Sequence, residues 1–381
     1  MENQDFLAYG LPLIEEDDIA GVVDSLRSGW LTRGPKTIAF EKAFAEYVGA
    51  KHAIGLNSCT SGQHLGLACL GIGPGDEVIT TPMTFVSTVN TILHVGARPV
   101  LADIDPRTMN SDVQKIEEAI SPRTKAIVPV HIAGYPCDMD EIMELARCHG
   151  LKVLEDAAHG VHTQYKGRMI GSIGDATVFS FYATKNLVTG EGGMITTNDD
   201  DLAERLRLMS CHGLSRGAWN RYTAQGSWYY EVLAPGYKYN MTDIQAALGL
   251  SQLNKLPRMQ ARREEIARRF NEAFAGCPAI ELPADSPDVR HAWHLYIIKL
   301  NLDEMNIDRN TFIERVKTQG VGTSVHFIPV HKHPFHRDYF GQVRCPVAEE
   351  VFERIVSLPL YPKMSDEDVE KVIRVVLETI E

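Results

Sequence analysis

The chain has 381 residues, of which 44% are hydrophobic and 23% are charged, so it can bury a large core and wholesale disorder is excluded. The 50 acidic and 38 basic residues give a formal net charge of −12, and no Lys/Arg-rich run marks a surface for nucleic acid or for an anionic membrane. No stretch of about 18 apolar residues runs without a charge, so no membrane insertion is expected.

Two features predict a cytoplasmic protein. The N-terminal segment has neither a basic region nor an uninterrupted apolar stretch, so a secretory signal is not expected. The 7 cysteines are odd in number, dispersed, and contain no Cys-x-x-Cys pair. This pattern is typical of buried thiols in a reducing compartment rather than of disulfides or a zinc site.

The first two thirds of the chain alternate short apolar runs with stretches of helical spacing. The apolar runs predict seven strands, at residues 53–56, 77–80, 99–103, 126–130, 152–155, 177–181 and 194–196. Between several of them, helices are predicted at residues 63–71, 85–95, 112–120, 138–149 and 201–209. This alternation predicts an α/β fold with a mostly parallel sheet, helices on both faces, and a ligand at the carboxyl ends of the strands.

The pattern changes after about residue 245. A long helical pattern rich in Arg and Glu covers residues 246–277, and the segments after it predict strands at 293–300 and 323–328 and helices at 311–319 and 366–380. A polar loop with four histidines lies between the second strand and the last helix. We therefore expect a large domain over residues 1–250 and a smaller α+β domain over residues 251–381.

Lys185 follows the strand predicted at 177–181 and precedes a turn with three glycines, at positions 190, 192 and 193. The glycines allow a tight turn and a close approach of the backbone to a ligand. A lysine just past a strand end, among small and apolar neighbours, is suited to a lowered pKa and to Schiff-base formation. The alternative is a solvated loop lysine beside a flexible turn.

Two adjacent carboxylates, Glu155 and Asp156, end the strand predicted at 152–155. Side chains alternate along a strand, so one of the two faces the expected ligand crevice. A carboxylate there can hold a proton on a heterocyclic nitrogen, and His159 is placed to orient it or to contact the ring. The alternative is that the two acids cap a helix that begins near Ala157.

The segment NSCTSG, residues 57–62, lies between a predicted strand and a predicted helix. Hydroxyls and free backbone N–H groups at a helix N-terminus suit a phosphate group. Ordinary capping by Ser58 or Thr60 gives the same pattern. Phe85 follows the next strand, where its ring can stack on a flat ligand, although core packing is the commoner role of a phenylalanine.

Together these segments require one ligand with a phosphate, a ring nitrogen and an aldehyde. Along the chain the order is the phosphate turn, Phe85, Glu-Asp-Ala-Ala-His, and then Ser-Phe-x-x-x-Lys with Gly-Glu-Gly-Gly. In this order, and with the blocks SGWLTRGPK, GYKYNMTDIQAA, HAWHLYII and SLPLYP, the chain resembles the sugar-nucleotide aminotransferases of the DegT/StrS type, which depend on pyridoxal 5'-phosphate (PLP). Within that family it most resembles the UDP-4-amino-4-deoxy-L-arabinose aminotransferases. The resemblance implies the fold type I of PLP-dependent transferases, which is aspartate aminotransferase-like, with a large seven-stranded sheet.

The same resemblance implies an enzyme that moves an amino group from L-glutamate to a nucleotide-linked keto sugar, specifically a UDP-4-keto sugar. Its product would serve cell-surface polysaccharide, lipopolysaccharide or amino-sugar biosynthesis. Two alternatives are a PLP-dependent sugar dehydratase of the same fold, in which histidine replaces the lysine, and a non-catalytic regulatory protein that binds PLP or a sugar nucleotide. The presence of both Lys185 and Asp156 favours transamination.

The resemblance also implies roles for individual residues. Lys185 matches the lysine that forms the Schiff base, and Asp156 matches the partner of the ring nitrogen. The other implied cofactor-binding residues are Thr60, Ser61, Phe85, His159, Ser180, Lys238 and Asn240. The implied substrate-binding residues are Thr32, Lys238, His326, Phe327 and His331. Lys238 and Asn240 match residues that reach the neighbouring subunit's site, which implies a homodimer with shared active sites.

The diphosphate of a nucleotide sugar requires basic partners, for which Lys238, Arg33 and Lys36 are candidates. The histidines at 326, 331, 333 and 336 lie close together in the sequence. Carboxylates or cysteines at ligand spacing are missing beside them, so no metal site is expected.

Overall fold

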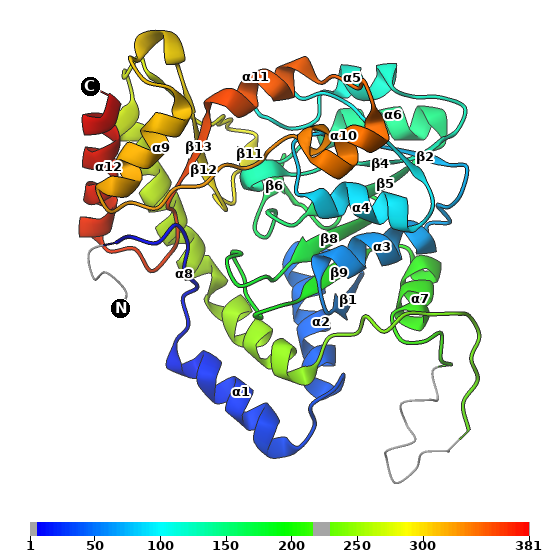
Figure 1. Cartoon of the computed structure of the whole chain (residues 1–381). Coiled ribbons are helices and arrows are strands. Elements are labelled where there is room, and N and C mark those ends of the chain that lie inside the picture. The colour runs from blue at the N-terminus through cyan, green and yellow to red at the C-terminus, as the bar shows by residue number, and fades with distance from the viewer. Residues whose placement is uncertain (1–5, 216–228, 381) are drawn as a thin grey trace.

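The computed structural model describes residues 6–215 and 229–380 (Figure 1). A seven-stranded sheet in the order β1-β9-β8-β5-β4-β2-β3 forms the centre of the larger part. Its strands are β1 (His52–Leu56), β2 (Glu77–Thr80), β3 (Arg98–Leu101), β4 (Thr124–Val128), β5 (Lys152–Ala157), β8 (Ala176–Ser180) and β9 (Gly193–Thr197). Strand β9 is antiparallel to both its neighbours, and all other pairs are parallel. The seven predicted strands and the mostly parallel sheet are confirmed.

Helices cover both faces of this sheet, as the sequence predicts. One face packs against α3 (Cys59–Cys69), α4 (Val86–His94) and α7 (Asp200–Met209), and the other against α2 (Pro35–Val48), α5 (Val113–Glu118), α6 (Met139–His149) and α8 (Asp243–Phe274). The alternation of side chains decides the face, because Leu154 packs in the first layer and Val153 in the second. Asp156 therefore belongs to the face of α3 and α4, and Glu155 to the opposite face.

The surroundings of Glu155 show what this alternation produces. Its buried carboxylate accepts hydrogen bonds from Gly174 N (2.8 Å), Thr177 Oγ1 (2.7 Å) and His131 Nε2 (3.0 Å). The alternative that the two acids cap a helix is wrong, because β5 continues through Ala157 and the chain then turns without forming a helix.

A second core lies in the smaller part of the molecule (Figure 1). A three-stranded antiparallel sheet of β10 (Ile280–Glu281), β12 (Tyr296–Leu300) and β13 (Ile355–Leu358) packs with α9 (Arg309–Thr318) and α12 (Asp366–Ile380). The strand predicted at 323–328 is not formed, because this segment meets β13 only through the single bridge Ser324–Ser357 and then turns to the cavity described below. The polar loop after it contains η4 (Val330–Lys332), α10 (Pro334–Phe340) and α11 (Pro346–Arg354).

The two parts are joined by continuous elements. Helix α8 spans 32 residues, so the boundary predicted at residue 250 lies inside it. Its first half packs on α2 and α1 (Glu16–Ser28), and its second half contributes Ile266, Phe270 and Phe274 to the smaller core. A small sheet of β6 (Gln164–Tyr165), β7 (Arg168–Met169) and β11 (Val289–Arg290) links the parts again. Two further short helices in the described part of the chain are η1 (Ile132–Gly134) and η3 (Leu302–Glu304).

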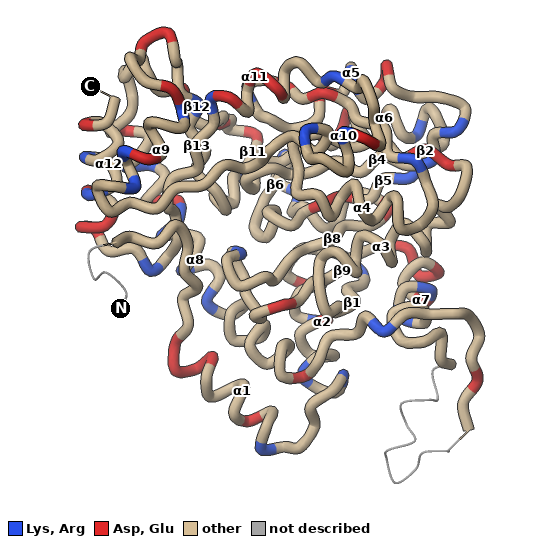
Figure 2. The backbone as a smooth tube through the Cα atoms, viewed as in Figure 1, with Lys and Arg blue, Asp and Glu red and all other residues tan. Residues whose placement is uncertain are grey.

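Acidic and basic residues are mixed over the structure, as the composition predicts. Figure 2 shows basic and acidic residues interspersed along the chain, without a continuous basic stripe on the face shown. Over residues 6–215 and 229–380, no helix is both long enough and apolar enough to cross a bilayer.

All 7 cysteines are free thiols. Cys148 is exposed and Cys277 is half-buried, so the expectation of buried thiols is confirmed for the other five.

Candidate active site

A cavity of about 560 Å³ lies at the carboxyl ends of β5 and β8. It is bounded by the N-terminus of α3, the loop before α4, the loop after β8 and the 326–327 segment of the smaller part. This is the edge of the sheet at which a ligand was expected. Eight of the predicted site residues line it: Thr60, Phe85, Asp156, His159, Ser180, Lys185, His326 and Phe327.

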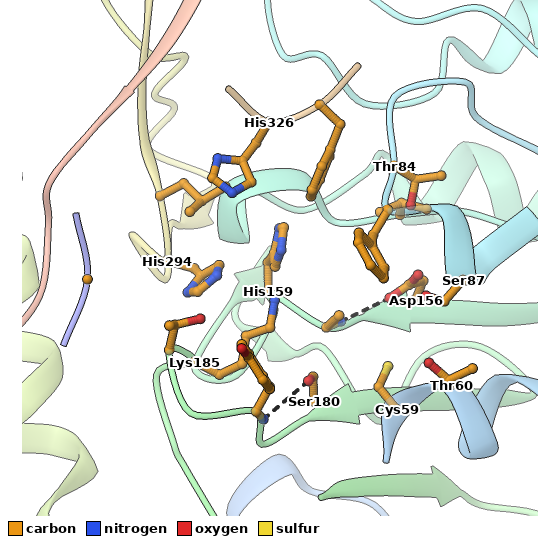
Figure 3. A pocket seen from close by; sticks show the side chains of 18 of the residues that line it. Cys59, Thr60, Thr84, Ser87, Asp156, His159, Ser180, Lys185, His294 and His326 are labelled. Atoms are coloured by element: carbon orange, nitrogen blue, oxygen red, sulfur yellow. Dashed lines mark hydrogen bonds between the residues drawn. The ribbon is translucent and has the colours of Figure 1, made fainter. Parts of the chain in front are cut away.

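Lys185 lies in the loop that follows β8, on one side of the cavity (Figure 3). Its backbone N–H donates to Tyr182 O (2.9 Å), which closes a tight turn and sets the direction of the side chain. Burial lowers the pKa of Lys185 to about 8, although the nearby Cys59 and Asp156 favour its charged form. A neutral amine, which is the nucleophilic form, is therefore accessible near physiological pH.

Asp156 lies one residue before the end of β5, lines the cavity and is only 3% exposed. Its Oδ2 accepts hydrogen bonds from Gln63 Nε2 (2.5 Å) and Thr88 Oγ1 (2.7 Å), and its Oδ1 accepts one from Ala158 N (3.1 Å). Burial raises the pKa of Asp156, whereas the bonds from Thr88 and Ala158 and the charge of Lys185 lower it.

The N-terminus of α3 forms another wall of the cavity. Ser58 caps the helix by accepting the Ser61 N–H (3.1 Å), and the exposed Thr60 lines the cavity. Ser61 does not line it, because its hydroxyl is turned to Asn57 Oδ1 (2.7 Å) and Ser58 O (2.8 Å). A Cβ at Gly193 would stand 2.6 Å from the Ser58 carbonyl, so only glycine lets β9 approach this turn so closely.

Three histidines, His159, His294 and His326, gather with Lys185 at one end of the cavity, as Figure 3 shows. The rings of His159 and His294 are 4.4 Å apart, and Phe327 stacks on His159 at 5.8 Å. Burial lowers the pKa of each histidine, with that of His326 at about 4, and the charge of Lys185 lowers all three further. The three rings are therefore neutral at pH 7.

The other predicted residues do not line the cavity. Thr32 is exposed in the loop before α2, Lys238 Nζ donates to Asn240 Oδ1 (2.5 Å), and the buried His331 pairs with Glu349 (3.2 Å). The two further candidates for a diphosphate are engaged in the ion pairs Arg33–Glu41 (2.9 Å) and Lys36–Asp24 (2.8 Å). Within the described residues, Lys185 is the one lysine or arginine that lines the cavity.

Sequence reasoning missed several lining residues. Ser58, Cys59 and Thr84 belong to motifs that were identified, but they were given no cavity role. His294 lies in the block HAWHLYII, where the neighbouring apolar residues favoured a strand. Tyr361 lies in the block SLPLYP, which was given no cavity role, and Tyr9 carries no local signal of a site.

The cavity brings together an amine of lowered pKa, a buried carboxylate and a helix N-terminus. These groups suit an aldehyde, a protonated ring nitrogen and a phosphate, which PLP combines in one molecule. In the part of the chain that the structure describes, no group of three His, Cys, Asp or Glu side chains is arranged for a metal ion.

Known proteins place this arrangement in a family. The model of the DegT/DnrJ/EryC1/StrS aminotransferase family matches residues 12–377. The spore coat polysaccharide biosynthesis protein SpsC of Bacillus subtilis is 57% identical over 378 residues, which are 98% of this chain and 97% of that protein.

Solved structures agree with the family model. The PMP-form of the putative sugar aminotransferase Spr1654 from Streptococcus pneumoniae has a TM-score of 0.91 at 35% identity and covers 98% of both chains. Helicobacter pylori PseC, an aminotransferase involved in the biosynthesis of pseudoaminic acid, has a TM-score of 0.92 at 31% identity and covers 98% of this chain and 99% of its own. The chain therefore belongs to the DegT/DnrJ/EryC1/StrS aminotransferase family, has the fold type I of PLP-dependent transferases, and is a PLP-dependent aminotransferase.

Proposed function

We propose that this enzyme transfers an amino group from L-glutamate to the keto group of a nucleotide-linked sugar, with a UDP-4-keto sugar as the preferred acceptor. The observation that carries the proposal is the meeting of Lys185, Asp156 and the α3 N-terminus in one cavity. The relative SpsC is named for polysaccharide biosynthesis, and the similar solved structures include sugar aminotransferases. The product then serves the synthesis of a cell-surface polysaccharide, a lipopolysaccharide or a free amino sugar.

Each residue of the cavity has a proposed task. Bound PLP supplies an electron sink for negative charge at the substrate carbon. Lys185 would hold the cofactor through Nζ, and as a neutral amine it would take the proton of the donor's amino-bearing carbon onto Nζ. Asp156 accepts the hydrogen bond of the protonated ring nitrogen. Thr60, Ser180 and the α3 N-terminus hold the phosphate, and Phe85 and His159 contact the ring.

The charge of the substrate supports a shared site. A nucleotide sugar brings a diphosphate, yet Lys185 is the one cation among the described lining residues of a single chain. We propose a homodimer in which Lys238 and Asn240 of each copy reach the other copy's site. The remaining residues proposed for ligand binding are Thr32, Ser61, His326, Phe327 and His331. The free thiols support a cytoplasmic location.

The donor reaction tests the proposal directly. Mixing the PLP-loaded enzyme with L-glutamate should convert its absorbance to that of pyridoxamine phosphate and release 2-oxoglutarate. The K185A variant is the control and should show neither change. An unchanged spectrum of the wild-type enzyme refutes glutamate as the donor.

The acceptor is tested with UDP-, GDP- and dTDP-linked keto sugars. The pyridoxamine form should return to the PLP form with the preferred acceptor. Failure with every 4-keto sugar refutes the proposed acceptor, while a response to a 3-keto sugar keeps the reaction type and moves the position of the new amino group.

Mixed variants test the shared site. K185A and K238A should each be inactive or strongly impaired alone. In a heterodimer of the two, one site receives both wild-type residues, so unfolding and refolding them together should restore roughly a quarter of the wild-type activity. No recovery, despite heterodimers seen by native mass spectrometry, contradicts a contribution of Lys238 across the interface.

A further inference from the structure

The carboxylate of Asp156 is held by two side chains that lie outside the cavity lining. Thr88 comes from α4 and Gln63 from α3, the two helices that cover the same face of the sheet as Asp156. Both donate to the same oxygen, Oδ2, at 2.7 and 2.5 Å, and among residues 6–215 and 229–380 the one donor to Oδ1 is the Ala158 N–H. Oδ1 therefore keeps acceptor capacity for a donor in the cavity.

The directions of these hydrogen bonds exclude a proton on Oδ2, to which Thr88 and Gln63 both donate. Thr88 has one hydroxyl hydrogen, which it gives to Asp156, so the 2.8 Å bond to Thr84 Oγ1 must run from Thr84 to Thr88. A proton on Oδ2 would face two donors and break the order of this chain. The four side chains, those of Gln63, Thr84, Thr88 and Asp156, are all buried, so an unpaired polar group among them is costly.

The amide of Gln63 is a second observation that a donor is held at the Asp156 carboxylate. Its Oε1 is buried and, within the described residues, has no hydrogen-bond partner. An orphaned carbonyl oxygen is costly in a protein interior. The amide keeps this orientation because its Nε2 is needed at the Asp156 carboxylate.

We propose that Thr88 and Gln63 are positioning residues that keep Asp156 ionised and turn its Oδ1 to the ring nitrogen of the bound cofactor. The inference rests on the role of Asp156 in the proposed function. Burial alone raises the pKa of this carboxyl group, and the bond from Thr88 opposes that rise. Loss of either donor weakens the hold of Asp156 on the proton of the ring nitrogen.

The T88V variant removes the hydroxyl and keeps the branched shape, and Q63M removes the amide and keeps the length. T91V is the matched control, because Thr91 is equally buried on α4 and its hydroxyl donates to the Thr88 carbonyl rather than to Asp156. T88S restores a hydroxyl at the key position. Thermal unfolding of each cofactor-free protein shows whether the variant is folded.

Two readouts separate positioning from mere structural support. The first is the pH midpoint of the absorbance change of bound PLP, which reports the coupled protonation of the ring system. T88V and Q63M should move it by roughly half a pH unit or more, whereas T91V and T88S should keep the wild-type midpoint. The second is the glutamate half-reaction, in which kcat should fall about tenfold with KM within twofold, since neither residue lines the cavity.

The outcomes are distinct from those that test the proposed function. An unchanged absorbance midpoint in both T88V and Q63M overturns the inference, as does an equal shift in T91V. If the wild-type enzyme does not react with glutamate but the midpoint shifts in the two variants alone, the proposed donor is wrong and the positioning role stands.

Discussion

Replacement of Asp156 by Asn removes one charge and keeps the size of the side chain. Gln63 and Thr88 both donate to Oδ2, so the amide oxygen of the asparagine must take that place. The NH₂ group then occupies the position of Oδ1, where it meets the Ala158 N–H and points a donor at the ring nitrogen of PLP. The variant therefore favours an unprotonated ring, which is a poor electron sink.

The magnitude follows from these contacts. Loss of one charge-assisted hydrogen bond in a buried site costs about 1.5 to 3 kcal/mol. The reversed donor adds to this, so the transition state should lose about 3 to 4 kcal/mol, which corresponds to a 10²- to 10³-fold lower rate. The cost falls on kcat of the half-reaction, because the glutamate carbon chain does not contact the ring nitrogen.

Stopped-flow absorbance after mixing D156N with L-glutamate measures this rate, and a titration with PLP establishes that the variant is loaded. A neutral side chain that slows the reaction less than about fivefold would refute the reasoning, since one lost charged bond already predicts more. The reaction would then not depend on a protonated ring.

Three further predictions concern the cavity and its support. Because the pKa of Lys185 falls from 10.5 to about 8 on folding, this group binds fewer protons in the folded cofactor-free protein than in the unfolded chain between these pH values, so its contribution to the free energy of unfolding rises with pH there. Denaturation of wild type and K185M over this range should show a stability difference, wild type minus K185M, that increases with pH, and a constant difference would contradict this. G193A should weaken PLP binding at least about tenfold, because the added Cβ would collide with the backbone of Ser58 at the α3 N-terminus. G73A is the control, because a Cβ there meets only an ordinary contact. Equal affinities for PLP in titrations of the two variants would contradict this prediction. D243A should lower the free energy of unfolding by about 3 to 5 kcal/mol in urea, because the buried carboxylate accepts the N–H groups of Gly34, Lys36 and Thr37; a loss below about 1 kcal/mol would contradict this.

The sheet and the long helix were predictable because each depends on a local pattern. Apolar runs bounded by turn residues mark the seven strands, and the helical spacing of residues 246–277 marks α8. β13 was missed, because its four residues are too few to show a period, and the segment 323–328 has the composition of a strand without a full partner. Pairing between distant segments decided both cases.

In the site, too, residues in local motifs were predictable and residues that depend on distant contacts were not. Lys185, Asp156 and the α3 turn stand in short motifs whose chemistry is visible in a few neighbouring residues. Gln63 and Thr88 look like ordinary helix residues in the sequence, since their partner lies 93 and 68 positions away. Thr32 and His331 illustrate the opposite limit, because a family pattern implies a role that the cavity of one chain does not display.

The alternation along β5 has a consequence for how this enzyme can change. Glu155 and Asp156 are chemically similar neighbours, yet one is bonded to His131 behind the sheet and the other faces the cavity. A single-residue insertion in β5 before Glu155 would move Glu155 to the cavity position and Asp156 to the opposite face. The enzyme would then present to PLP a longer carboxylate without its clamp, and leave a shorter one out of reach of His131. Such a change in the length of β5 would therefore remove Asp156 from the cavity. Length variation in this family should be confined to loops that leave β5 intact.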